Sequence, residues 1–318
     1  MSSGFFRYPG PRQSAARLLL AALVCLTPWT GWAQIDQQPS KAQPPDTEES
    51  VVAVPARPTV TNPAHIPLPG YLQFEQGFLQ ATSSVNGNLR QFSLVQTTKL
   101  ALSHHLMVQI MDQPFAHTLL DGSASGTGNS AAESDPGDLQ LGGQVLFTDV
   151  KEGFGKEPTI ALAYQHVVRT GTAPDIDIGS NRQGLTLLAS GSIYGLHYDT
   201  NAVFGEQTND VQAGLSTRTI RRGQFGQSLS VTRQITKPFS VSVELWHFTQ
   251  PFIAASVDGV PVARANAVGL LFAPGYNLRD NLVLDAGFSR GLTSTSTQWQ
   301  GFAGFTYLLP KRLWPPRK

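Results

Sequence analysis

The sequence is poor in charge and almost free of cysteine. Charged residues make up 14% of the 318 residues, against about 25% in ordinary soluble domains. Lys plus Arg number 23 and Asp plus Glu 22, so the chain has no net field to recruit nucleic acid. The one cysteine, Cys25, lies in a segment that we expect to be removed. The mature chain would then have no disulfide and no thiolate chemistry. No stretch keeps the 3.6-residue hydrophobic period of a helix.

Instead, the sequence alternates apolar and polar residues. Residues 138–150 (DLQLGGQVLFTDV) show the pattern clearly, with Leu139, Leu141, Val145 and Phe147 on one side and Asp138, Gln140 and Gln144 on the other. Successive side chains of a strand point to opposite faces, so this stretch predicts a strand with one apolar face. Twelve segments carry the same pattern, near 71–81, 90–102, 105–113, 138–149, 158–169, 184–193, 196–206, 222–234, 238–249, 263–274, 281–290 and 297–308.

The connections between these segments alternate in length. Those near 103–104, 150–157, 194–195, 235–237 and 275–280 are short, and those near 82–89, 114–137, 170–183, 207–221, 250–262 and 291–296 are mostly longer. Bacterial outer-membrane barrels have short periplasmic turns and longer extracellular loops. We therefore predict an all-β fold, a transmembrane antiparallel β-barrel of twelve strands over residues 69–309.

Soluble β-sandwiches and lipocalin-type barrels also alternate apolar and polar residues. Low charge and aromatic placement favour the membrane barrel. Aromatic residues lie near both ends of the predicted strands, Phe248 and Trp299 among those near the longer loops, as expected of girdles at two membrane interfaces.

Three further segments flank the barrel. Residues 1–33 are typical of a secretory signal peptide, with Arg7, Arg12 and Arg17 before the apolar stretch 18–26 and small residues before Gln34. We expect Sec-type export and cleavage before Gln34; acylation of Cys25 or retention of the segment is the alternative. Residues 34–68 are rich in proline and polar residues, which predicts a mobile periplasmic linker. Residues 310–318 form a C-terminal tail.

No motif for catalysis or metal binding emerges. His104-His105 has no further ligand at zinc spacing, and the glycine-rich stretch 122–128 lacks the Lys of a phosphate loop. His166 and His247 lie on predicted strands without a recognisable serine nucleophile nearby. We predict a protein that is not an enzyme and has no metal and no cofactor.

Ionisable groups at membrane depth are costly facing lipid, so the polar face should line the lumen. The candidate lumen-lining residues are Glu75, Lys99, Gln109, Asp138, Gln140, Gln144, Asp199, Asn201, Glu244 and Asp285. They could form a structural network or line a path for solutes. Leu139, Leu141, Val145 and Phe147 should face lipid.

Two stretches carry a family resemblance. Residues 57–61 (RPTVT) with 69–77 (PGYLQFEQG) resemble the opening "RPdfT…PpGhlqlExG", and residues 136–142 (PGDLQLG) resemble the strand "GDlxlG". Both are found in outer-membrane proteins of the MetA-pathway of phenol degradation family. Thr59 stands where the family usually has Asp, and Val168-Arg169-Thr170-Gly171 replaces its "PTG". The resemblance implies a barrel for the passage of hydrophobic or aromatic compounds.

We therefore expect an outer-membrane channel for passive uptake of small aromatic or other hydrophobic compounds. Its partners would be outer-membrane lipid and a small-molecule solute, with no nucleic acid. A structural or surface-interaction barrel with a closed lumen is the main alternative. A barrel hydrolase is a third, which would need a convergent Ser, His and acid.

Overall fold

The computed structural model describes residues 52–57, 59–83, 89–120, 131–148, 158–173, 180–213, 216–252, 256–257, 260–261 and 265–314. All of them belong to the unit Ser50–Lys318. The predicted signal peptide and its cleavage site lie outside these residues. Within the described ranges, no helix is long and apolar enough to cross a membrane.

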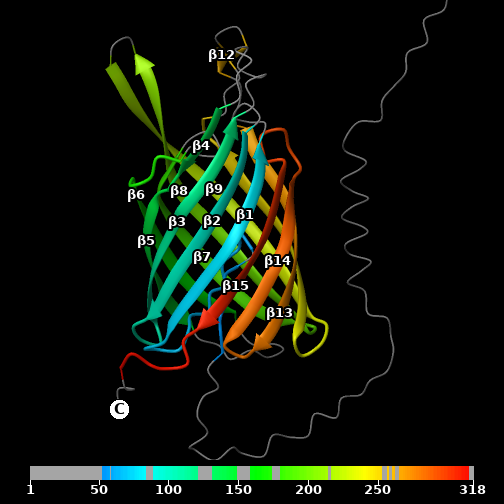
Figure 1. Cartoon of the computed structure of the whole chain (residues 1–318). Helices are drawn as coiled ribbons and strands as arrows, with labels where there is room; N and C mark the ends of the chain where they lie inside the picture. Colours follow the sequence, from blue (N-terminus) through cyan, green and yellow to red (C-terminus); the bar gives the residue numbers. More distant parts are fainter. Residues whose placement is uncertain are drawn as a thin grey trace, which may run out of the picture. The chain divides into compact units, whose positions relative to one another are not determined.

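Twelve antiparallel strands form a closed barrel (Figure 1). The ring runs through consecutive neighbours and closes where the first strand pairs with the last, Gln73 opposite Leu308. Its strands are β1 (Leu72–Ser83), β2 (Leu89–Ala101), β3 (Leu106–Leu120), β5 (Leu139–Thr148), β6 (Thr159–Val168), β7 (Ser180–Ile193), β8 (Leu196–Ala213), β9 (Ser216–Gln234), β10 (Phe239–Gln250), β13 (Ala265–Arg279), β14 (Leu282–Gly291) and β15 (Trp299–Leu308). The predicted fold class is confirmed.

Three short strands lie outside the ring. β4 (Ala131–Asp135) pairs with the end of β3, from Ala116 opposite Asp135 to Leu120 opposite Ala131. β11 (Ser256–Val257) and β12 (Val260–Pro261) pair only with each other.

The short turns gather at one end of the barrel, which is also where β15 ends (Figure 1). Two of these turns have only two residues, and one of the two joins β7 to β8 through Tyr194 and Gly195, with φ of 52° and 75°. Positive φ at both central residues matches the right-handed twist of the paired strands. We call this the short-turn end.

At the opposite end, β8 and β9 extend as a hairpin beyond the rest of the barrel (Figure 1). Their register continues without a break from Gln207 opposite Arg222 to Ala213 opposite Ser216. The prediction of a loop over 207–221 was therefore wrong for most of its length. Its first residues, 207–210 (QTND), are all polar, so the segment opens without the alternation used to recognise strands, but its backbone groups still pair across the hairpin.

The outer face of the barrel is apolar. Leu141 and Val145 are each 42% exposed and Phe147 is 58% exposed, while Leu139 is partly exposed. Aromatic side chains such as Phe78 and Phe92 stack side by side on the same face, with ring centroids 5.7 Å apart. An apolar band around a closed barrel is what a strand-built membrane protein presents to lipid.

The inner face is polar and buried. Gln73, Glu75, Lys99, Ser190, Asn201, Glu244 and Asp285 all lie there with at most 6% of their surface exposed. The two clusters of buried apolar residues each include a residue that precedes the first strand: Ala64 packs with Leu146, Ala161 and Leu188, and Ala53 with Tyr71 and Leu308.

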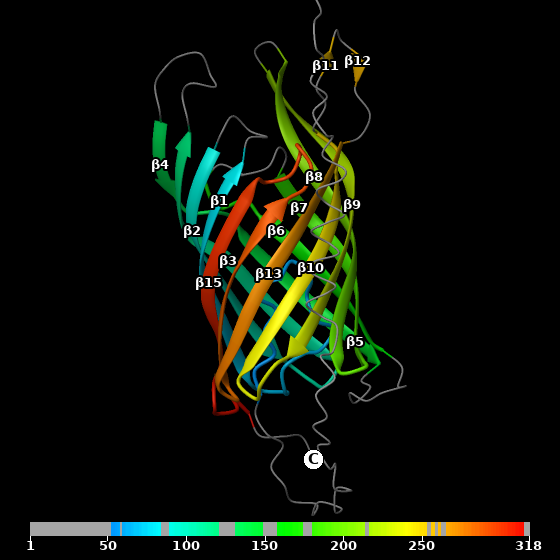
Figure 2. The same ribbon diagram turned by 90° about the vertical axis from the view of Figure 1, so that its right-hand side faces the viewer.

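Residues 52–57 and 59–70, which we call the arm, lie inside the barrel near the short-turn end (Figure 2). The expectation of a mobile linker does not hold for this described part of 34–68. It rested on the proline and polar residues of the segment. The arm instead satisfies its polar groups with side chains of the lumen, where Thr61 is 1% exposed.

Candidate functional site

The arm enters and leaves the lumen at the same end. The Ala53 N–H donates to the Asp280 carbonyl in the turn between β13 and β14, at 2.9 Å. Seventeen positions later, the Gly70 N–H donates to the Ala101 carbonyl at the end of β2, at 2.8 Å. The arm therefore rises into the lumen and returns, so it occupies the half of the barrel nearest the short turns.

The ascending leg lies against a buried cluster on β1 and β2. Glu75 Oε1 accepts from Lys99 Nζ at 2.5 Å, from Gln73 Nε2 at 2.8 Å and from the Ala56 N–H at 3.3 Å. Gln73 also accepts from the Val54 N–H at 2.9 Å and donates to the Val54 carbonyl at 2.7 Å. A buried carboxyl group needs such partners to offset its desolvation.

Arg57 fixes the next step of the arm. Its Nε lies 3.7 Å from Asp285 Oδ1 on β14, and the Asp285 side chain is 1% exposed. The guanidinium lies on Gly77 of β1, where an added Cβ would come within 2.1 Å of Arg57 Nη2. A glycine at this position leaves the space that the arginine fills.

At its apex the arm is held by Glu244 of β10. Glu244 Oε2 accepts from the Val60 N–H at 3.0 Å, and Oε1 accepts from the Thr61 N–H at 2.9 Å and from Thr61 Oγ1 at 2.8 Å. The side-chain amide of Asn201 pairs with Asn62, donating to its carbonyl and accepting from its N–H. Three donors on one carboxyl group make this the most densely bonded point of the arm.

The descending leg is held by β5, β7 and β8. The Ala64 N–H donates to Ser190 Oγ at 2.7 Å, and Ser190 Oγ donates to Asp199 Oδ1 at 2.5 Å. From the other side, Gln144 Nε2 donates to the Ala64 carbonyl at 2.7 Å. The rings of His65 and His197 lie 6.2 Å apart.

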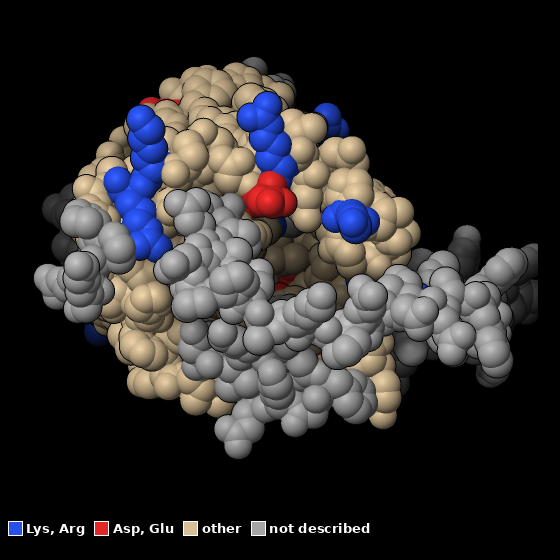
Figure 3. All heavy atoms as spheres, turned by 90° about the horizontal axis from the view of Figure 1, so that it is seen from below, with Lys and Arg blue, Asp and Glu red and all other residues tan. Residues whose placement is uncertain are grey.

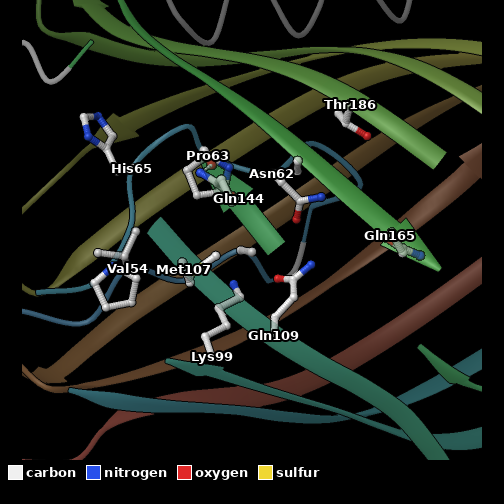
Figure 4. Close-up of a pocket in the computed structure, with 13 residues that line it drawn as sticks. Val54, Asn62, Pro63, His65, Lys99, Met107, Gln109, Gln144, Gln165 and Thr186 are labelled. Carbon is white, nitrogen blue, oxygen red and sulfur yellow. Dashed lines mark hydrogen bonds between the residues drawn. The ribbon is translucent and has the colours of Figure 1, made fainter. Parts of the chain in front are cut away.

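Little space remains at the level of the arm. Figure 4 shows side chains of the arm, among them Val54, Asn62 and His65, facing Lys99 and Gln144 of the wall. The cavity between them has a volume of about 30 Å³. That is enough for a water molecule and too little for an organic solute.

A larger cavity lies beyond the apex, toward the long-loop end. Its volume is about 190 Å³. Its lining is uncharged and comprises Val60, Asn181, Gln207, Gln224, Trp246, Phe248, Gln250, Ala267, Thr297 and Gln300.

From the short-turn end the barrel is hollowed at its centre, with Lys and Arg side chains on the surrounding face (Figure 3).

The ten candidate lumen residues have different surroundings. Glu75, Gln144, Asn201, Glu244 and Asp285 contact the arm directly, and Lys99 and Asp199 contact it through Glu75 and Ser190. Gln109 lines the small cavity at the level of the arm. Gln140 accepts a hydrogen bond from Gln165 along the wall.

Asp138 is bonded to the wall. Its Oδ1 accepts from the Thr170 N–H at 3.0 Å and from the Gly171 N–H at 2.9 Å. In return, Thr170 Oγ1 accepts from the Leu139 N–H at 3.0 Å. Asp138 thus ties the start of β5 to the segment that follows β6, which is a structural role at the rim.

The structure also brings together a Ser, a His and an Asp that the sequence reasoning missed. His197 Nε2 lies 3.2 Å from Asp199 Oδ1, and His197 Nδ1 lies 3.5 Å from Ser192 Oγ. A general base activates a nucleophile from about 2.6–3.2 Å, so the Ser192 contact is long. Asp199 is engaged by Ser190, which holds the arm. Among the described residues, no group of three or more His, Cys, Asp or Glu is placed to hold a metal ion.

Trp246 and Phe248 were also missed as lumen residues. Their spacing from Glu244 already indicated their direction, because positions two and four residues further along a strand share its face. Phe248 was assigned to an aromatic girdle at the membrane surface; the structure places it in the lining of the larger cavity.

An apolar outer face, a polar lumen and twelve closed antiparallel strands define a β-barrel of the outer-membrane type. The chain belongs to the family described as "Putative MetA-pathway of phenol degradation", whose model matches residues 56–309. That match begins inside the arm, so the family pattern includes both arm and barrel.

Among solved structures, the chain is similar to the COG4313 outer membrane channel from Pseudomonas putida F1. The identity is 15% and the TM-score 0.57, with 85% of this chain and 100% of that chain covered. The translocator domain of the autotransporter NalP from Neisseria meningitidis matches at 8% identity and a TM-score of 0.48, covering 75% and 88%. The Pseudomonas putida toluene transporter TodX matches at 10% identity and a TM-score of 0.39, with 76% of this chain and 89% of that chain covered. No curated protein sequence matches the chain.

Proposed function

We propose that the protein is a channel for passive uptake of small aromatic or other hydrophobic compounds and that its arm sets the width of the lumen. The observation that supports this most directly is how the arm is held. Side chains provide most of its contacts, and its described residues form no strand ladder with the wall. A segment held in this way can leave the lumen without unfolding the barrel.

Passage of a ring-sized solute requires the arm to move. The space left beside it is about 30 Å³, whereas a cavity of about 150 Å³ is known to hold benzene. A hydrogen bond within a protein contributes a net of about 1 kcal/mol, so the arm's contacts can be exchanged for water in steps. Diffusion through the released lumen needs no cofactor.

We place the short-turn end in the periplasm, since outer-membrane barrels have their short turns there. Export through the Sec pathway and cleavage before Gln34 would deliver the chain to that compartment. The arm would then obstruct the periplasmic half of the lumen, and the larger cavity would face the cell exterior. Outer-membrane lipid would surround the apolar band.

A pair of cysteines can lock the arm in place. The Ala64 N–H lies 2.7 Å from Ser190 Oγ, so their Cα atoms can be at most about 6.5 Å apart, within reach of a disulfide. We expect Ala64→Cys with Ser190→Cys to give low current through planar bilayers when oxidised. Reduction should restore current and the uptake of phenol into proteoliposomes.

A second cysteine pair serves as the matched control. Gln96 and Asp112 are cross-strand partners on β2 and β3, so a disulfide there joins two wall strands and leaves the arm free. Its oxidation should leave the current unchanged.

The alternative, a structural barrel with a closed lumen, is favoured by the buried Arg57–Asp285 pair and the Glu75 cluster. Equal, near-zero currents from the oxidised and reduced Ala64→Cys/Ser190→Cys protein would contradict the channel and support this alternative.

A further inference from the structure

The larger cavity is shaped by two aromatic rings that lie against glycines. An added Cβ on Gly269 of β13 would come within 2.2 Å of the Trp246 ring, and one on Gly226 of β9 within 2.3 Å of the Phe248 ring. Each glycine is the direct cross-strand partner of the aromatic residue beside it. The rings therefore lie close to the wall and leave the space beside them open.

Polar atoms at this cavity remain without partners. Within the described part of the chain, no hydrogen-bond partner reaches Trp246 Nε1, Gln207 Oε1 or Gln250 Oε1. Gln207 is 3% exposed and Gln250 is 4% exposed. Burying such a group without a partner costs roughly 1–3 kcal/mol. One free N–H donor and two free carbonyl acceptors thus line a cavity that also presents indole and phenyl rings.

From this arrangement we infer that the cavity is a binding site for a small neutral ring compound bearing hydroxyl or similar hydrogen-bonding groups. The inference rests on the proposed channel function and names the class of solute. The flat apolar body would lie against Trp246 and Phe248. A hydroxyl group would donate to Gln207 or Gln250 and accept from Trp246.

The dimensions and charge of the cavity agree with this class. Its volume of about 190 Å³ exceeds the roughly 150 Å³ that holds benzene, so one substituted ring fits. No lining residue carries a formal charge, so a charged ring would lose its hydration without a counterion. A bare hydrocarbon would fit but would leave all three polar atoms unpaired.

Equilibrium dialysis of the full-length protein in detergent tests the inference. Radiolabelled phenol, toluene and benzoate serve as probes, with protein-free micelles as the blank. We expect saturable binding of phenol, with a Kd at least tenfold below that of toluene, and no saturable binding of benzoate. Toluene binding as tightly as phenol, or phenol showing no saturation above the blank, would overturn the inference.

Matched variants locate the site. Gln250→Met removes an acceptor at similar length and should raise the Kd for phenol about fivefold, which corresponds to one lost hydrogen bond. Gln80→Met is the control, since Gln80 is exposed on the outer face of β1. Trp246→Phe should likewise weaken phenol binding, and its control is Trp299→Phe, because Trp299 is 49% exposed.

Toluene binding should not be weakened in Gln250→Met, because toluene makes no hydrogen bond to Gln250, and this distinguishes a lost hydrogen bond from a general disturbance of the barrel. Equal phenol affinity in Gln250→Met, Trp246→Phe and their controls would place binding elsewhere and overturn the assignment. If the reduced Ala64→Cys/Ser190→Cys protein carries current but phenol does not bind, the binding-site inference is contradicted and the channel proposal stands. If phenol binds and no current is ever seen, the channel proposal fails instead.

Discussion

Replacing Glu244 with glutamine should release the arm from the lumen. The carboxyl group accepts the Val60 N–H at 3.0 Å on one oxygen, and the Thr61 N–H at 2.9 Å and Thr61 Oγ1 at 2.8 Å on the other. A side-chain amide has one acceptor oxygen, and its other terminus is a donor. The amide in Glu244→Gln would therefore set an N–H against at least one N–H of the arm.

The structure allows the size of the effect to be worked out. Glu244 is 0% exposed and Thr61 is 1% exposed, so water does not readily replace the lost partner. A hydrogen bond to a charged group contributes about 1.5–3 kcal/mol. Taking roughly 2 kcal/mol for the lost contact predicts a rise of about 30-fold in the population of the released arm.

Amide hydrogen exchange followed by mass spectrometry measures this population. When opening and closing are fast, the exchange rate of a protected amide follows the fraction of open molecules. We expect peptides covering Val60 and Thr61 to exchange about 30-fold faster in Glu244→Gln. Peptides from the wall strands should keep their wild-type rates, and the mean current through planar bilayers should rise.

The control for this prediction is Glu206→Gln. Glu206 lies 3.6 Å from Arg221 on the hairpin of β8 and β9, with 27% of its side chain exposed. This ion pair joins β8 to β9 and is worth little at such exposure. If exchange at Val60 and Thr61 is the same in Glu244→Gln as in Glu206→Gln, the reasoning that Glu244 holds the arm is refuted.

Three further predictions concern the arm, the wall and the rim. Gly77→Ala should displace Arg57, since the added Cβ would lie 2.1 Å from its Nη2. Breaking the buried ion pair of Arg57 with Asp285 costs about 3 kcal/mol, so the amide hydrogens of the arm should exchange faster. Leu141→Arg puts a charge on the outer face, where Leu141 is 42% exposed, and should lower folding stability in lipid vesicles by roughly 2 kcal/mol. Asp138→Ala removes the contacts to the segment after β6 and should lower folding stability in lipid vesicles by about 1–2 kcal/mol without changing the current; an altered current would contradict its structural role.

Much of the barrel could be predicted from the sequence because its information is local. Along β10, Val243 and Leu245 alternate with Ser242 and Glu244, and that alternation alone assigns each side chain a face. The same parity puts Trp246 on the lumen face, although it was not among the predicted lumen residues. The missed part of β8 begins with four polar residues, QTND, so the alternation that marks a strand stops there and the stretch resembled a loop.

The arm could not be predicted, because its partners are distant in sequence. Thr61 and Glu244 are separated by 183 residues, and Ala64 and Ser190 by 126. The prediction of a linker used only the composition of the segment, whereas in the lumen the segment finds hydrogen-bond partners for its polar groups. Recognising this requires knowing that the barrel interior is polar and wide enough to admit a second layer of chain.

The residues that carry the family resemblance build the arm and the wall. Arg57 and Gly77 form one contact, Glu75 holds the ascending leg, and Asp138 ties β5 to its neighbour. None of these four lines the larger cavity, whose aromatic and amide residues all lie outside both motifs. The motifs therefore identify the arm and the residues that hold it, and Val60 is the motif residue that lines the larger cavity. If the larger cavity binds the solute as we propose, the side chains around Trp246 would decide which solute is chosen. This is why binding of phenol and release of the arm are tested by separate experiments.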